Sequence, residues 1–172
     1  MTIEPDTKDW TWVLERPCDE CGFDSAAFGV DQIPELIRDN TRGWSQALAS
    51  PDVAVRPVPQ IWSTLEYACH VRDVHTVFAE RVALMLRQDD PVFESWDQDA
   101  AAVEKAYGDQ DASTVEVELT RAAEVAAGAY AAVTGEQWQR PGRRSNGSEF
   151  TVETLGRYHL HDVVHHLYDV RS

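Results

Sequence analysis

The segment from residue 63 to residue 87 constrains the fold most, because its pattern predicts a long amphipathic helix with a defined start. Ser63 and Glu66 have the spacing of a capping box, and Trp62 and Tyr67 have that of a hydrophobic staple. Apolar side chains then recur at helical spacing and mark one buried stripe: Tyr67, Val71, Val74, Phe78, Val82 and Met85. A helix with one apolar face needs neighbours to cover it, so the segment predicts a helical bundle.

Three further segments carry signals of helix starts. One long helix is expected after Asp31 as N-cap, and another after Asp111 or Ser113. The last helix is expected to begin at Thr151 and to continue nearly to the C-terminus. Residues 91–108 predict a loop with a short, weaker helix, and the alternating pattern of strands is scarce throughout.

These segments predict an all-α fold, in which a four-helix bundle over residues 31–172 follows an irregular N-terminal arm over residues 1–30. Proline and glycine punctuate the arm, and its aromatic side chains are expected to pack it on the bundle. The segment 139–149 is rich in turn-forming residues and is expected to form turns.

The charge of the chain disfavours two classes of partner. Its formal net charge is −15, with 30 acidic and 15 basic residues, which disfavours binding to nucleic acid or to an anionic membrane surface. Apolar runs are too short to span a bilayer, and the first residues lack an apolar signal region. Three cysteines, without the spacing of a disulfide framework, are typical of the reducing cytoplasm, which is the predicted location.

His161 and His165 are four residues apart in the last predicted helix, so their imidazoles lie one turn apart on one face. Two ligands of one metal ion need this arrangement. The alternatives are a coincidental surface pair and two hydrogen-bonded core groups. On a helical wheel the pair lies beside the apolar arc, whereas His159 and His166 project on the other flank.

A third histidine, His70, lies in the helix predicted for residues 63–87. Together with His161 and His165 it would form a three-histidine site that leaves one coordination position open for chemistry. His70 and His75 lie on opposite shoulders of the buried stripe, so either side chain can face the interior. A hydrogen-bonded core histidine is the alternative to a ligand at this position.

Three segments resemble the DinB/YfiT-like superfamily of bacterial four-helix-bundle metalloenzymes: WSTLEYACHVRDVHTVFAERVALML, ESWDQDAAAVEKAY and RPGRRSNGSEFTVETLGRYHLHDVVHHLYDV. The resemblance covers about residues 31–170 and extends into DWTWVLERPCDECGFD of the arm. In that family a histidine of the second helix and an HxxxH pair of the last helix bind the metal. The resemblance thereby assigns the ligands to His70, His161 and His165.

The resemblance also implies a chemistry, with one zinc or nickel ion as cofactor. Some relatives are similar to thiol S-transferases that use mycothiol or bacillithiol, and one is a mycothiol-dependent maleylpyruvate isomerase. There the metal lowers the pKa of the thiol and presents it to an electrophile. One ligand from the last helix of that isomerase is a carboxylate, whereas the assignment here gives His161, which argues against assuming isomerase activity.

Other residues are weaker candidates. Arg140, Arg143 and Arg144 form the basic cluster of an acidic chain and are candidates for binding an anionic thiol or substrate, with a solvated turn as the alternative. Acidic side chains near the histidines can orient imidazoles, and the candidates are Asp73, Asp162 and Asp169.

Cys18 and Cys21 form a CxxC motif in the arm. A structural zinc site needs two more ligands, and the sequence has no second CxxC. A redox pair would lack the strand–helix context of thioredoxin-like sites, so a tight turn beside Gly22 is the alternative to a chemical role.

These observations favour a divalent-metal-dependent thiol S-transferase with a small thiol and an electrophile as its partners. Catalysis would then depend on a metal-bound thiol or water, and no catalytic side chain can be named from the sequence. The alternatives are a metal-dependent hydrolase and a non-catalytic protein that binds a metal or a small ligand. The resemblance is also compatible with a homodimer.

Overall fold

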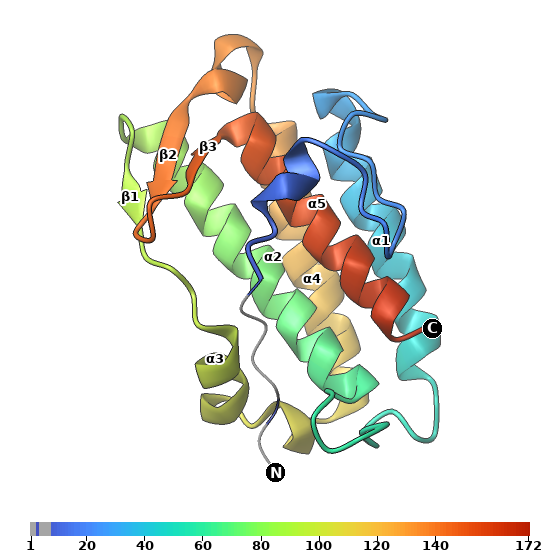
Figure 1. Cartoon of the computed structure of the whole chain (residues 1–172). Coiled ribbons are helices and arrows are strands. Elements are labelled where there is room, and N and C mark those ends of the chain that lie inside the picture. The colour runs from blue at the N-terminus through green and yellow to red at the C-terminus, as the bar shows by residue number, and fades with distance from the viewer. Residues whose placement is uncertain (1–2, 4–7) are drawn as a thin grey trace.

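The computed structural model describes residue 3 and residues 8–172, so residues 1–2 and 4–7 of the predicted arm lie outside the described part. Long helices form the body of the molecule (Figure 1). They are α1 (Ile33–Leu48), α2 (Thr64–Arg87), α4 (Ala112–Ala131) and α5 (Val152–Asp169). Both α1 and α2 pack mainly against α4 and α5, so these two consecutive helices lie at opposite corners of the bundle.

Three of the four long helices begin where the capping signals predict, whereas α1 begins at Ile33 after Gln32, which makes no side-chain cap, and not after Asp31 as N-cap. The Glu66 N–H donates to Ser63 Oγ at 3.2 Å, and the Ser63 N–H donates to Glu66 Oε2 at 2.8 Å, which confirms the capping box of α2. The side chain of Asp111 accepts from the Thr114 N–H at the start of α4. Thr151 caps α5 in the same way. Local sequence therefore fixes where each of these three helices begins.

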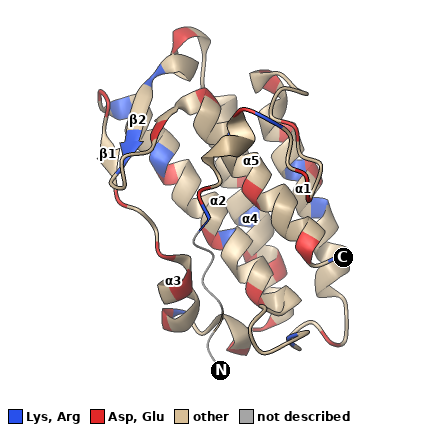
Figure 2. Ribbon diagram, viewed as in Figure 1, with Lys and Arg blue, Asp and Glu red and all other residues tan. Residues whose placement is uncertain are grey.

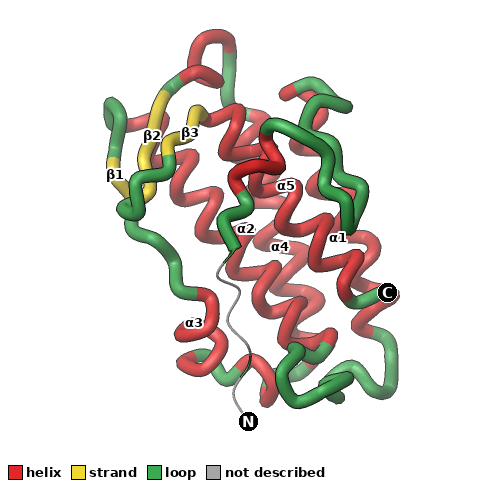
Figure 3. The backbone as a smooth tube through the Cα atoms, in the orientation of Figure 1, coloured by secondary structure: helices red, strands yellow, loops and turns green. Residues whose placement is uncertain are grey.

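A small sheet stands beside the helices, so the expectation of a strictly all-α fold is incomplete (Figure 3). β1 (Val92–Phe93) pairs in parallel with β2 (Pro141–Arg144), which pairs antiparallel with β3 (Glu149–Thr151). Gly147, with φ of 95°, lies in the turn between β2 and β3. The strands are too short to show an alternating pattern in the sequence. The short helix predicted before residue 108 is α3 (Gln98–Glu104).

The described part of the arm packs along α5. Val13, Cys18 and Phe23 are buried against the bundle. Arg157 of α5 donates hydrogen bonds to the carbonyl oxygens of Ser25 and Phe28 of the arm. The arm therefore covers one flank of α5, where Trp10 of the arm packs on His161 and His165.

Charged residues are distributed unevenly over the fold. Figure 2 shows acidic positions on every long helix and basic positions on β2. Within the described residues, none of the helices has both the length and the apolar character needed to cross a membrane.

Candidate metal centres

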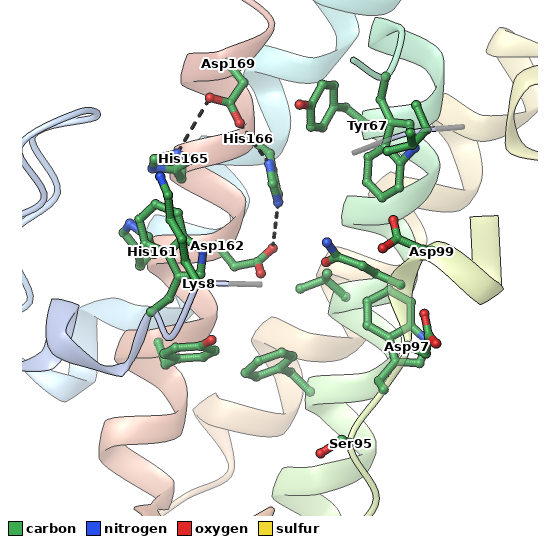
Figure 4. A pocket seen from close by; sticks show the side chains of 18 of the residues that line it. Lys8, Tyr67, Ser95, Asp97, Asp99, His161, Asp162, His165, His166 and Asp169 are labelled. Atoms are coloured by element: carbon green, nitrogen blue, oxygen red, sulfur yellow. Dashed lines mark hydrogen bonds and ion pairs between the residues drawn. The ribbon is translucent and has the colours of Figure 1, made fainter. Parts of the chain in front are cut away.

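The first cluster lies between α2 and α5. His70 comes from α2, and Asp162 and His166 come from α5; one ligand atom of each lies within 4.8 Å of the others. Asp162 Oδ1 is 3.5 Å from His70 Nε2 and 3.7 Å from His166 Nε2. Figure 4 shows Asp162 and His166 on the same stretch of α5, with a dashed line joining their side chains. Two imidazoles and one carboxylate meeting in this way can form a catalytic metal site with an open position.

The protonation states of this cluster suit a divalent cation. Burial lowers the pKa of His70 below its ordinary value and keeps the imidazole neutral. Burial would raise the pKa of Asp162, but His70 and His166 hold it well below its usual range, so the carboxylate is charged. Both ring nitrogens of His70 and Oδ1 of Asp162 are buried without a hydrogen-bond partner among the described residues. Such atoms are costly to bury, and a cation between them would satisfy them.

The second cluster lies on the flank of α5 that the arm covers. Cys18, Cys21, His161 and His165 each offer a ligand atom within 4.8 Å of the other three. Cys18 Sγ is 3.7 Å from His165 Nδ1, and the ring centroids of His161 and His165 are 5.1 Å apart. Burial raises the pKa of the Cys21 thiol to about 11. The CxxC motif of the arm and the pair of histidines on α5, which are far apart in the sequence, therefore meet in space.

The structure groups the predicted ligands differently from the expected three-histidine set. His161 and His165 lie together as expected, but with the cysteines of the arm, whereas His70 lies with Asp162 and His166. The reason is geometric, because successive residues of a helix point about 100° apart. One pair faces the arm and the other faces α2. Asp162 and His166 are also four residues apart, which is the signal that could have identified them.

The remaining two histidines belong to the core. His75 Nδ1 lies 3.0 Å from His159 Nε2, and His159 Nδ1 lies 3.1 Å from the hydroxyl of Tyr130. All three side chains are fully buried. These three side chains form a hydrogen-bonded chain inside the bundle. His75 and His159 are therefore hydrogen-bonded core histidines.

A cavity of about 710 Å³ opens beside the first cluster. Trp96 stacks on His70 with ring planes 15° apart, and Trp62 also packs on this imidazole, with centroids 5.3 Å apart. Trp10, from the arm, also lines the cavity and packs on His165 at 4.9 Å. The cavity is large enough for a small organic ligand, and residues of both the arm and the bundle line it.

The structure separates the three arginines of the predicted basic cluster. Arg140 donates to the carbonyl oxygens of Met85 and Gln88 at the end of α2, and Arg143 pairs with Asp90. Arg144 lines the cavity, where its guanidinium lies over the rings of Phe150 and Tyr158.

A second cavity arginine, Arg81, was not identified from the sequence, because its position on α2 resembles that of an ordinary surface residue. It donates to the carbonyl oxygen of Glu94, and burial lowers its pKa to about 10, which still leaves it charged at neutral pH. Arg81 and Arg144 therefore put two positive charges on the cavity wall.

The acidic residues proposed to orient imidazoles have different surroundings. Asp169 Oδ2 lies 3.1 Å from His166 Nδ1, on the side of the ring away from Asp162. Such an arrangement fixes the tautomer and direction of a ligating histidine. Asp73 instead accepts hydrogen bonds from Arg72, Lys105 and Tyr107.

A helical bundle with such a cluster between facing helices defines a class of proteins that hold metal ions in the bundle core. The model of the DinB superfamily matches residues 35–170, and the chain belongs to that superfamily. Among solved structures, the chain is similar to YfiT from Bacillus subtilis, described as "a probable metal-dependent hydrolase with an unusual four-helix bundle topology". The TM-score is 0.72 at 18% identity, over 84% of this chain and 89% of that chain. No curated protein sequence gives a significant match.

Proposed function

We propose that this protein is a divalent-metal-dependent enzyme whose ion, zinc or nickel, is held by His70, Asp162 and His166. The observation that carries the proposal is the approach of these three ligand atoms to within 4.8 Å at a cavity of about 710 Å³. This set replaces the set of His70, His161 and His165 expected from the sequence. A bound ion would supply Lewis acidity, which lowers the pKa of a thiol or of water.

We propose further that the site serves transfer of a low-molecular-weight thiol of the mycothiol or bacillithiol type to an electrophile. Arg81 and Arg144 favour a thiolate and can bind the anionic groups of a thiol or of an acceptor. Trp62 and Trp96 both pack on the imidazole of His70 and would help to exclude water from the site. The carboxylate of Asp162 also removes the objection to a likeness with the thiol-dependent isomerase, since that objection depended on His161 as ligand.

The roles of the individual side chains follow from their contacts. Asp169 accepts a hydrogen bond from Nδ1 of His166, which leaves Nε2 of the same ring facing Asp162 as the ligand atom. Trp96, stacked on His70, fixes the plane of that imidazole. The two arginines orient the substrate relative to the three ligands, because both are anchored, Arg81 by the carbonyl of Glu94 and Arg144 by two aromatic rings.

A metal-dependent hydrolase is the second candidate. The description of YfiT as a probable metal-dependent hydrolase favours it, and two histidines with one carboxylate are also the ligands of many hydrolytic zinc sites. In that case the same ligands would serve to activate water rather than a thiol.

One experiment distinguishes the two candidates. Zinc-loaded and nickel-loaded protein is incubated with monochlorobimane and mycothiol, bacillithiol or glutathione, and in parallel with p-nitrophenyl acetate without a thiol. The thiol proposal predicts bimane conjugation that requires metal and is lost in His166→Ala. Ester hydrolysis without thiol, lost in the same variant, would support the hydrolase instead. Equal activity of His166→Ala in both assays would contradict the metal site itself.

A further inference from the structure

The second cluster, on the other flank of α5, is not part of the proposed active site. Its four members are two cysteines three residues apart and two histidines four residues apart, which is the ligand set of Cys₂His₂ zinc sites. From the sequence alone the CxxC motif lacked two ligands. We infer that Cys18, Cys21, His161 and His165 form a structural zinc site that fastens the N-terminal arm to α5.

The distances agree with a single tetrahedral ion. Zn–S and Zn–N bonds of about 2.3 and 2.0 Å put sulfur and nitrogen about 3.5 Å apart across a tetrahedral ion. Cys18 Sγ and His165 Nδ1 are 3.7 Å apart. Two ordered segments supply the four ligands. The histidines are one turn apart on α5, and the cysteines belong to one tight turn of the arm.

The turn of the arm is built to present both thiols to α5. The Gly22 N–H donates to the Cys18 carbonyl at 2.9 Å, and the Cys18 N–H donates to the Phe23 carbonyl at 2.8 Å. Gly22 has φ of 73°, a conformation that other residues adopt only with strain. Glycine after CxxC therefore closes the turn with both sulfur atoms on one side.

Four ligands from the protein would close this site to a substrate, although His161 and His165 also belong to the lining of the cavity. Cys18, His161 and His165 are buried, with exposed fractions of 2%, 3% and 7%. Trp10 covers both histidines, with ring centroids 5.3 and 4.9 Å away. Nε2 of His161 is buried without a hydrogen-bond partner in the part of the chain that the structure describes. A cation between the ligands resolves this cost, and four protein ligands leave no position for a substrate.

Carboxylates complete the site on its outer side. His165 turns Nδ1 to Cys18, and its Nε2 lies 3.5 Å from Glu20 and 3.7 Å from Asp169. Acceptors on the far nitrogen of a zinc-bound imidazole fix its tautomer. Asp169 also contacts His166 of the first cluster, so the two sites share one carboxylate.

The function of this ion would be to hold the arm, and with it Trp10, over the cavity. Its loss would leave buried side chains, the packing of Trp10 on the two histidines and the hydrogen bonds of Arg157 among the contacts that bind the arm to α5. The site is independent of the proposed function, because it uses none of the three ligands of the first cluster.

The test uses the full chain, reduced and loaded with Zn²⁺, and the His166→Ala variant, in which only the second site remains. X-ray absorption at the zinc edge of His166→Ala should give sulfur scatterers at about 2.3 Å. Cys18→Ser or Cys21→Ser in the same background should lose the zinc, whereas Cys69→Ser, which changes the cysteine outside the cluster, should retain it. Circular dichroism checks that each variant is folded.

Two results would overturn the inference. One is zinc bound in His166→Ala with nitrogen and oxygen ligands alone. The other is a reduced protein, with all three thiols titratable, that binds no zinc in His166→Ala while wild type still binds one ion. The second result would leave the first cluster intact, so failure of this inference is distinguishable from failure of the proposed function.

Discussion

His165 and His166 are adjacent in the chain, yet their imidazoles belong to different clusters. Their ring centroids are 6.1 Å apart with the ring planes at 88°. His165 turns to Cys18 of the arm, and His166 turns to His70 of α2. Fewer than two turns of α5 thereby supply two interleaved pairs of ligands, one on each flank of the helix.

Arg144 is expected to bind the anionic group of the substrate or thiol. The variant Arg144→Gln should raise KM for an anionic thiol about tenfold with kcat little changed, since one charge-assisted hydrogen bond is lost. Arg143→Gln is the matched control, because Arg143 lies on the same strand but pairs with Asp90 outside the cavity. Steady-state kinetics of both variants with the same thiol measures the difference. Equal KM values for the two variants would remove Arg144 from the binding site.

The buried chain of His75, His159 and Tyr130 should contribute to stability rather than to metal binding. Tyr130→Phe removes the hydroxyl 3.1 Å from His159 Nδ1 and leaves a buried nitrogen unpaired. We expect a loss of about 1–3 kcal/mol in the free energy of unfolding, measured by urea denaturation, with unchanged metal content. Tyr168→Phe, at an exposed position, should change stability little. A metal loss in Tyr130→Phe would contradict this assignment.

Acid should destabilise the fold through His75. Burial lowers the pKa of His75 to about 4, whereas in the unfolded chain it is near 6.5. Between these values the unfolded state binds the extra proton, so stability falls as the pH is lowered from about 6.5 to about 4. For this residue the loss at pH 5 is on the order of 2 kcal/mol. Urea denaturation of chelator-treated protein at pH 7 and pH 5 should show a smaller loss in His75→Leu than in wild type; an identical loss would contradict the prediction.

The helices could be predicted because their signals are local. Ser63 with Glu66, Asp111 and Thr151 all cap helices where the sequence indicates, since a cap depends only on residues within one turn. The sheet cannot be predicted in this way, because β1 and β2 are short and Val92 pairs with Arg143, which lies 51 positions further along the chain (143 − 92). Such contacts leave no local pattern.

The candidate sites can likewise be predicted only where the signal is local. The sequence indicates that α5 carries ligands, because imidazoles four residues apart share a face. It does not indicate which face of α5 meets α2, since His161 with His165 and Asp162 with His166 have the same spacing. The rotation of α5 is set by burial of Leu155, Leu160 and Val163 as α5 packs against α1 and α2, which is a property of the whole bundle.

The most direct test of the account is the number of zinc ions bound per chain. Inductively coupled plasma mass spectrometry measures this number in wild type, His165→Ala and His166→Ala. The account predicts two ions in wild type and one in each variant, with sulfur ligands retained only in His166→Ala. A single ion in wild type that is lost in His165→Ala and retained in His166→Ala, without sulfur ligands, would contradict it. That result would instead indicate one site built from His70, His161 and His165.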